Sequence, residues 1–242
     1  MSTAILLLAA RQGSSDGVAE GYPLCLAEID GVSLIERIIG NTRAIPDSKY
    51  IFALLDKEVK RFHLDQAVSL LAPNSKIVCV PDSTKGSACT ALLAVSQINP
   101  DDSLLIISAN ELVECDLYEV VRYFEESNLD AGTLIFHSIH PRYSYVRLNE
   151  DLMVTEAAQQ NPISSHATTG IFWFKRTSEF IDSAKAAIRK DSTTSGNFYL
   201  APTFNELILK QKRIGVFKIE NEKYHPLKNS RQVERFESGD RL

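Results

Sequence analysis

An apolar run leads directly into a Gly/Ser-rich turn in the sequence Ala4-Ile-Leu-Leu-Leu-Ala-Ala-Arg-Gln-Gly-Ser-Ser-Asp-Gly17. A short, continuous apolar run is typical of a strand that is buried on both faces of a parallel sheet. A glycine-rich turn between such a strand and a helix presents backbone N–H groups to a phosphate. The stretch therefore predicts an α/β protein with a phosphate-shaped loop after its first strand.

Further apolar runs alternate with amphipathic stretches through the first half of the chain. The expected strands are residues 5–9, 50–54, 77–80 and 104–108. This strand–helix alternation is typical of a parallel sheet with right-handed crossovers. Ligands of such sheets bind outside the carboxyl ends of the strands, so we expect the functional site there.

Helix start signals lie between these runs. Ser33 and Glu36 form a capping box, and Asp56 and Asp116 are N-cap residues of two further expected helices. For the helix that begins at Asp56 we expect an inward face made of Val59, Phe62, Ala67 and Leu70.

The second half of the chain is more mixed. We expect strands at 131–136, 144–148, 169–174 and 213–219, and helices at 178–188 and 201–209. Because no linker, repeat or low-complexity segment is visible, the chain is expected to be a single domain over residues 1–242. Its nucleotide-binding half would span about 1–115 and its acceptor half about 116–230, followed by a polar tail, 231–242, that frays or covers a partner.

Composition excludes several classes of protein. The chain has 242 residues, of which 44% are hydrophobic, and no apolar stretch approaches the roughly 18 residues that cross a bilayer. A net charge of -5 argues against nucleic acid as a partner. The four cysteines show no metal or disulfide spacing, so we expect reduced thiols and a cytoplasmic location. Because no long apolar stretch is present, we also expect no membrane insertion.

The connection from residue 11 to residue 32 is unusually long for a compact domain. It shows no clear helix or long strand and contains Gly13, Gly17 and Gly21. Loops longer than about 12–15 residues are usually functional or disordered. A mobile surface loop is one interpretation, but its position after the first strand favours a loop that wraps a ligand.

A set of motifs surrounds this loop. They are Leu8-Ala-Ala10 before Gln12-Gly-Ser14, Pro23-Leu-Cys-Leu-Ala-Glu-Ile-Asp-Gly31, Thr84-Lys-Gly-Ser-Ala-Cys-Thr90 and Ala109-Asn-Glu111. Together they resemble the sugar nucleotidyltransferases, which join a nucleoside triphosphate to a sugar phosphate and release pyrophosphate. The resemblance implies a three-layer α/β/α fold of the GT-A or Rossmann-like type, with a mainly parallel mixed sheet.

Three further motifs resemble a branch of that superfamily found with bacterial capsule and surface-polysaccharide genes. They are His140-Pro-Arg-Tyr-Ser-Tyr-Val146, Pro162-Ile-Ser164 with Thr169-Gly170, and Gly196-Asn-Phe-Tyr199 with Asn205-Glu206. The motifs are fairly specific for the fold and weak for the substrate.

The chain departs from the family where the family places its charges. Members of the family spread the phosphate charge over a loop Arg, a following Lys, and Mg²⁺ held by an Asp. Ser15 stands in place of that Arg, Leu24 in place of that Lys, and Gln159-Gln160 in place of a Glu-Lys pair. The metal position corresponds to Leu112 or, one residue earlier, to Glu111. Each lost contact commonly costs about 10²–10³ in rate, which leaves little catalysis by the usual route.

The resemblance carries a set of site residues over to this chain. Arg11 and Glu111 are the catalytic candidates, and Glu111 is also a weak metal candidate, because Mg²⁺ usually takes one or two carboxylates plus substrate phosphates. The nucleotide-binding candidates are Ala9, Ala10, Gln12, Gly13, Ser14, Lys85 and Gly86. The acceptor-binding candidates are Gln160, Thr169, Gly170, Asn197, Tyr199, Asn205 and Glu206.

For Arg11 two interpretations stay open. Its guanidinium could replace the cation lost at Ser15 and clamp a phosphate, or its side chain could fill the phosphate site or point into solvent. The region where a second acidic ligand would be expected reads Tyr224-His-Pro-Leu227 instead.

These observations lead to a hypothesis with two alternatives. The leading hypothesis is a nucleotidyltransferase-like protein of bacterial capsule or lipopolysaccharide synthesis, with an NTP as cosubstrate, Mg²⁺ as cofactor and a phosphorylated sugar or small polar molecule as acceptor. One alternative is a pseudoenzyme that binds a nucleotide or nucleotide sugar without turnover. The other is a GT-A-like glycosyltransferase, against which the missing Asp-x-Asp motif argues. Such domains commonly pair, so a homodimer is also among the expectations.

Overall fold

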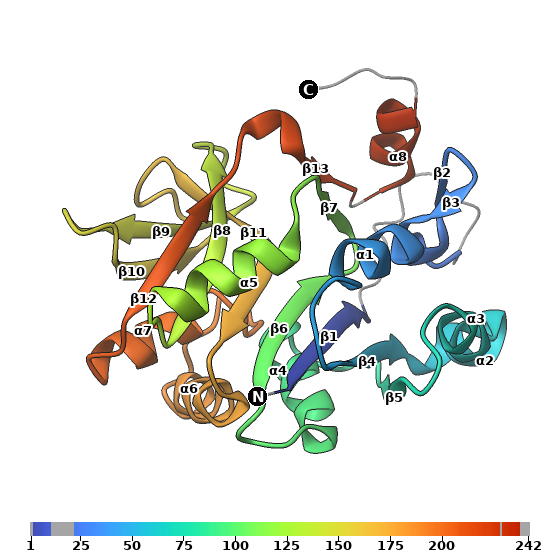
Figure 1. Ribbon diagram of the computed structural model, residues 1–242, viewed down its shortest axis with the longest axis horizontal. Coiled ribbons are helices and arrows are strands. Elements are labelled where there is room, and N and C mark those ends of the chain that lie inside the picture. Colours follow the sequence, from blue (N-terminus) through green and yellow to red (C-terminus); the bar gives the residue numbers. More distant parts are fainter. Residues whose placement is uncertain (1, 11–21, 228, 238–242) are drawn as a thin grey trace.

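The computed structural model describes residues 2–10, 22–227 and 229–237 of the chain. Its main sheet has nine strands: β1 (Thr3–Ala9), β4 (Ser48–Leu55), β5 (Lys76–Val80), β6 (Ser103–Ser108), β8 (Ala131–His137), β9 (Ser144–Leu148), β10 (Val154–Gln159), β11 (His166–Phe174) and β12 (Ile214–Lys218). Seven of them follow the order β10-β9-β11-β6-β1-β4-β5, while β8 pairs with β11 and β12 pairs with β8. The sheet therefore runs through both halves of the chain (Figure 1).

The first half of the chain forms the parallel part of this sheet. β1 pairs in parallel with both β4 and β6, and β4 pairs in parallel with β5. β11 joins this part antiparallel to β6, and β9 and β10 continue antiparallel beyond it. The result is a mixed, mostly parallel sheet, as the sequence predicts.

Helices pack on both faces of the sheet and complete three layers. One face is covered by α1 (Leu34–Thr42), α3 (Leu64–Leu71) and α5 (Leu117–Glu126), and the other by α4 (Ser87–Ala94), α6 (Thr177–Arg189) and α7 (Thr203–Leu209). Side chains of a strand alternate between its faces. Accordingly, Ile5 and Leu7 of β1 pack in one core cluster, while Leu6 and Leu8 pack in the other. The expected α/β/α class is confirmed.

The remaining elements are short. They are three 3₁₀ turns, η1 (Leu24–Leu26), η2 (Val95–Gln97) and η3 (Asn221–Lys223), the helices α2 (Asp56–Phe62) and α8 (Ser230–Glu237), and two ribbons. One ribbon pairs β2 (Glu28–Ile29) with β3 (Val32–Ser33), and the other pairs β7 (Glu111–Val113) with β13 (Tyr224–Pro226). The β7–β13 ribbon connects distant parts of the chain.

The helix expected from Asp56 onward is in fact two helices. His63 adopts a left-handed conformation with φ 51°, ends α2 and starts α3. This break changes the helical phase, so that Leu64 and Val68 are buried and Leu70 is 84% exposed. The expectation that Leu70 faces inward is therefore wrong, because a continuous period was assumed across the break.

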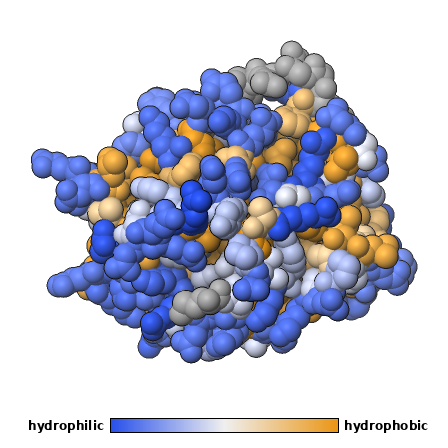
Figure 2. Space-filling model, viewed as in Figure 1, coloured by the Kyte–Doolittle hydropathy of each residue, from blue (hydrophilic) through white to orange (hydrophobic). Residues whose placement is uncertain are grey.

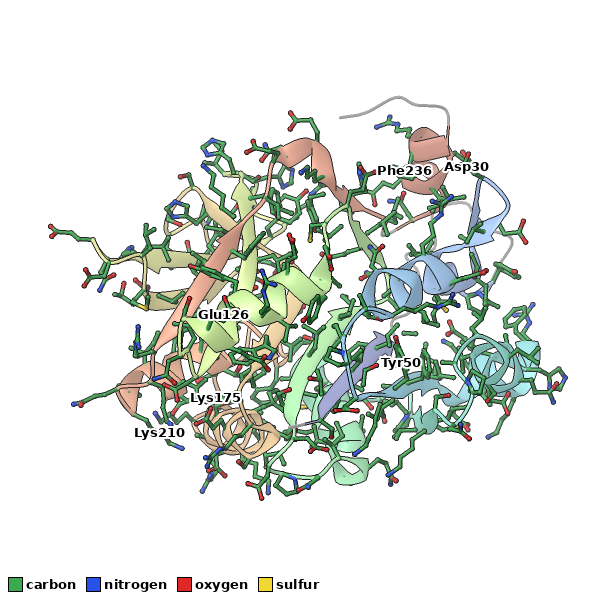
Figure 3. All side chains as sticks on the ribbon, in the orientation of Figure 1. Asp30, Tyr50, Glu126, Lys175, Lys210 and Phe236 are labelled. Carbon is green, nitrogen blue, oxygen red and sulfur yellow. The ribbon has the colours of Figure 1, made fainter. Side chains whose placement is uncertain are left out.

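Two other expectations about the chain can be compared with the structure. Residues up to 237 in the polar tail form α8, and Val233 of this helix is buried. Phe236 of α8 lies beside Asp30 of the β2–β3 turn (Figure 3). All four cysteines are free thiols, as expected.

Among the described residues, no helix is long and apolar enough to cross a membrane. On the face shown in Figure 2, hydrophilic residues dominate and hydrophobic residues lie in separate patches.

Candidate functional site

A cavity of about 590 Å³ opens where the parallel strands end. Its first wall contains Ala10 after β1, Leu55 at the end of β4, Asp82 after β5 and Ser108 at the end of β6. The carboxyl ends of parallel strands meet at one edge, which is where ligands of open α/β sheets bind. We call this side, together with the start of α4, the parallel-strand wall.

The start of α4 is built around Gly86. This residue has φ +88°, and a Cβ there would lie 2.2 Å from the carbonyl oxygen of Phe198. The Phe198 N–H donates to the Lys85 carbonyl at 3.0 Å, and the Ala88 N–H donates to the Phe198 carbonyl at 3.1 Å. Only glycine fits this contact, which holds the 196–199 segment against the first turn of α4.

Behind this wall lies a buried acid that the sequence analysis did not single out. Glu58 of α2 is 7% exposed. Burial is the main cause that raises the pKa of its carboxyl to about 7, while Lys57 lowers this pKa and Asp82 raises it. Asp82 itself pairs with Lys57 at 3.1 Å.

The opposite side of the cavity, which we call the antiparallel-strand wall, is made by side chains of β9, β10, β11 and β7. Glu111 of β7 is 9% exposed, and its Oε2 accepts two hydrogen bonds. The Gly170 N–H donates to it at 2.7 Å, and the Tyr224 hydroxyl donates at 2.8 Å. A Cβ on Gly170 would lie 2.5 Å from the Ser108 Cβ and 3.0 Å from the Glu111 Cδ, so this position also needs glycine.

Tyr224 reaches Glu111 from β13, 113 residues further along the chain. It is 6% exposed, and its ring packs 4.2 Å from that of Phe136, between ring centroids. Burial, helped by the Glu111 carboxylate, raises the pKa of the Tyr224 phenol well above its ordinary value. The phenol is therefore protonated at neutral pH and acts as a donor.

Arg142 supplies positive charge to this wall. It is the one cationic side chain among the described residues that line the cavity. Its guanidinium lies 4.7 Å from the ring centroid of Tyr143 and donates to the Tyr143 hydroxyl. Stacking and hydrogen bonding hold the side chain in place while its charge stays accessible.

Uncharged polar groups form a row beside Arg142. Thr168 of β11 pairs in register with Ser144 of β9, which pairs with Gln159 of β10. Residues directly opposite on neighbouring strands point to the same face, and all three line the cavity. The Ser144 hydroxyl donates to the Gln159 side-chain oxygen. Thr168 is 4% exposed, and within the described structure its Oγ1 has no hydrogen-bond partner.

The structure brings many of the predicted site residues to one cavity. Those that line it are Ala10, Gly86, Glu111, Gln160, Thr169, Gly170, Asn197 and Tyr199. Gln160 has φ 55°, and its N–H donates to the Tyr143 carbonyl at 2.9 Å. Ala9 and Lys85 do not line the cavity, since Ala9 is buried in the sheet and Lys85 is exposed beside it.

Asn205 and Glu206 also lie away from the cavity. The Asn205 side-chain amide accepts from the Ala157 N–H at 2.9 Å and donates to the Ala157 carbonyl at 2.8 Å. Glu206 pairs with Lys190 at 2.8 Å. These contacts fasten α7 to β10 and to the end of α6. Arg11, Gln12, Gly13 and Ser14 lie outside the described residues, and so does Ser15.

The described residues do not fit a magnesium ion held by the protein. Mg²⁺ prefers oxygen ligands in octahedral geometry. Of the carboxylates that line the described cavity, Asp82 is paired with Lys57, and the Oε2 of Glu111 already accepts two hydrogen bonds. No group of three or more His, Cys, Asp or Glu in the described part could hold a metal. We assign no step to such an ion, and Glu111 as a metal ligand stays a prediction.

Four residues of this region were not predicted as site residues from the sequence: Arg142, Tyr224, Thr168 and Ser144. Arg142 and Ser144 belong to the His140–Val146 motif, which was noted only for its resemblance to the polysaccharide branch. A cation just before the expected strand 144–148 was the signal that could have indicated Arg142. Tyr224 was noted only where a second acidic residue would be expected. Thr168 carried no signal, because a threonine inside a strand usually only packs.

Comparisons with known proteins bear on the fold. No protein-family model matches the chain, and no curated protein matches its sequence. A nucleoside-diphosphate-sugar pyrophosphorylase from Vibrio cholerae matches in structure with a TM-score of 0.79 and 19% identity, over 96% of this chain and 99% of that chain.

Two further solved structures are similar. A protein of Bacillus anthracis described as a candidate glucose-1-phosphate thymidylyltransferase, in complex with sucrose, matches with a TM-score of 0.74 and 17% identity, over 98% of this chain and 94% of that one. A UDP-glucose pyrophosphorylase complexed with UDP-glucose matches with a TM-score of 0.76 and 13% identity, over 99% and 98%. At such low identity these matches show the fold, which is that of sugar nucleotidyltransferases.

Proposed function

We propose that the chain binds a nucleotide sugar, or a nucleotide beside a sugar phosphate, as a cytoplasmic nucleotidyltransferase-like protein of bacterial surface-polysaccharide synthesis. The observation that carries the proposal is the composition of the cavity at the ends of the parallel strands. It joins the backbone turn at Gly86, a row of hydroxyl and amide groups, and the guanidinium of Arg142. The polysaccharide context rests on the motifs that begin at His140, Pro162 and Gly196.

Each part of the cavity suits one part of such a ligand. A base approaches backbone closely where side chains are absent, as at Gly86. Hydroxyl groups of a sugar pair with Ser144 and Gln159, and few such polar groups are enough to orient a ligand in a cavity of this volume. Arg142 presents a fork that matches a phosphate in two hydrogen bonds.

Nucleotidyl transfer is a second candidate function, and Arg142 is the observation that favours it. Attack on the α-phosphorus builds negative charge on the phosphates, which a preorganised cation stabilises. The chain places a cation, Arg142, on the antiparallel-strand wall. The resemblance, by contrast, implies cations at and after the glycine loop. Pyrophosphate release with an NTP and a sugar phosphate would distinguish transfer from binding without turnover.

Arg142→Gln tests the proposal, with Arg147→Gln as its matched control. Arg147 lies five residues further on, is exposed, pairs with Glu156 at 2.7 Å and does not line the cavity. Calorimetric titration with a panel of NTPs, nucleotide sugars and sugar phosphates should identify a ligand. We expect Arg142→Gln to weaken its binding about tenfold or more, and Arg147→Gln to leave it within about twofold. No binding by any member of the panel, or equal effects of the two variants, would refute the proposal.

A further inference from the structure

Glu111 and Tyr224 come from the two strands of one ribbon at the edge of the cavity. β7 and β13 pair antiparallel, with Val113 opposite Tyr224 and Pro226 opposite Glu111. The Tyr224 hydroxyl donates to the Glu111 Oε2 at 2.8 Å, along a diagonal of this register, because Glu111 lies two residues before Val113. The ribbon thus places a phenol beside a buried carboxylate.

The same carboxylate oxygen has a second donor. The Gly170 N–H from β11 reaches Oε2 at 2.7 Å, so two donors from different strands converge on it. A hydrogen-bond donor and a metal ion compete for the same lone pairs of an oxygen. A cation at this oxygen would have to displace donors that are held by packed backbone, and displaced donors in a buried site are left unsatisfied.

We propose that the Tyr224 hydroxyl occupies, at Glu111, the position that a divalent cation would need, so that this cavity binds its ligand without a protein-held metal ion. In this arrangement the Glu111 carboxylate and the Tyr224 phenol are hydrogen-bonded to each other, and no cation lies between them. The positive charge offered to the ligand comes from Arg142 on the same wall.

The charges around the cavity agree with this arrangement. Asp82, the other acidic side chain in the described lining, is paired with Lys57 and lies on the opposite, parallel-strand wall. Mg²⁺ is usually held by one or two carboxylates together with substrate phosphates. Here the Oε2 of one carboxylate accepts from two donors, and the other carboxylate is paired with a cation.

A direct test uses Mn²⁺ alone as the probe, with its free-ion electron paramagnetic resonance signal as the readout. We expect the full-length wild-type protein to leave the signal unchanged through the micromolar range. Binding in the micromolar range that Glu111→Gln removes would overturn the proposal. This titration needs no substrate and no activity.

A gain-of-binding variant tests the position of the hydroxyl. Tyr224→Asp places a second carboxylate beside Glu111, and we expect it to bind Mn²⁺ about tenfold or more tightly than the wild type does. The double variant Glu111→Gln/Tyr224→Asp is the control and should lose this gain. A folded Tyr224→Asp protein without any gain would refute the proposal. Circular dichroism establishes folding, and if the variant does not fold, the wild-type titration decides alone.

A third measurement concerns the ligand and rests on the proposed function. Its calorimetric affinity for the wild-type protein should agree within about twofold in EDTA and in Mg²⁺, because no protein-held ion contributes. An affinity that falls in EDTA would refute metal-independent binding. If no nucleotide or nucleotide sugar binds at all, the proposed function fails, while the Mn²⁺ titration still decides the assignment of Tyr224.

Discussion

The two walls of the cavity are built in different ways. The parallel-strand wall consists of strand ends and a helix start, where short side chains and the backbone at Gly86 set the shape. The antiparallel-strand wall consists of side chains, Thr168, Ser144, Arg142 and Glu111 among them, which register and long-range contacts bring together. The first wall is defined by shape and the second by hydrogen bonds and charge.

This difference separates two kinds of sensitivity to mutation. A wall made of closely packed backbone tolerates no added atom, because the neighbouring backbone cannot move away. A wall made of polar side chains tolerates changes of shape but responds when a donor or an acceptor is removed. The variants below test this contrast.

Gly86→Ala should have the largest effect. The new Cβ would lie 2.2 Å from the Phe198 carbonyl oxygen, in a residue with φ +88°. Backbone strain and overpacking together should lower the free energy of unfolding by about 3 kcal/mol, measurable by urea unfolding. The same variant should lose ligand binding, because the 196–199 segment and α4 must separate.

Gly31→Ala is the matched control for this variant. Gly31 also has positive φ, +73°, but nothing lies within 4 Å of an added Cβ. Only the conformational strain remains, so a loss of about 1 kcal/mol is expected. Equal losses in the two variants would show that the close approach to Phe198 does not matter.

Glu58→Gln should have an intermediate effect that depends on pH. The pKa of Glu58 is raised to about 7 in the native protein from an ordinary value of 4.5. Between these values the native state holds a proton that the unfolded state has lost, so stability decreases as pH rises through this window. Above it, the native protein carries the full cost of a buried charge.

The Gln variant removes this titration. Because Glu58 is 7% exposed and solvent screens part of the interaction, the free energy of unfolding at pH 8 should rise by about 1–2 kcal/mol, which is less than the full pKa shift corresponds to. The gain should disappear near pH 4, where both native and unfolded Glu58 are protonated. Urea unfolding at a series of pH values checks this, and a gain independent of pH would contradict the stated cause.

Thr168→Val should have the smallest effect. It should change the melting temperature in the opposite direction to its control, Thr133→Val. The buried Thr168 Oγ1 has no partner in the described structure, so its removal should raise the melting temperature by about 2–4 °C. Thr133 of β8 is also buried, but its hydroxyl donates to the Ile171 carbonyl at 2.7 Å. Thr133→Val should therefore lower the melting temperature, and scanning calorimetry that finds the same sign for both would refute this account.

Much of the parallel-strand wall could be predicted from the sequence. The run from Ala4 to Ala9 predicts β1, and the small residues around Gly86 predict a turn that opens a helix. Both are local patterns, since apolar runs and helix starts follow from residues that are near each other in the chain. Leu70 shows the limit of such patterns, because one left-handed residue, His63, changed the phase of the helix.

The contacts of the antiparallel-strand wall could not be predicted in this way. Glu111 was singled out through the family resemblance, but its partners Gly170 and Tyr224 lie 59 and 113 residues away. Asn205 and Glu206, which belong to a motif of the same resemblance, fasten α7 and do not reach the cavity. The same polar residue types serve both purposes, and sequence proximity does not tell them apart.

The sequence by itself determined the α/β class, the segments that form the parallel strands and the edge at which the cavity opens, because strand and helix periods are local and parallel strands end together. Only the tertiary structure decided which charges the site holds. Arg142 enters the cavity because β9 pairs with β10 and β11, and Tyr224 bonds Glu111 because β13 pairs with β7 from a distant part of the chain. Such pairings depend on packing and register over the whole sheet, which no local pattern encodes.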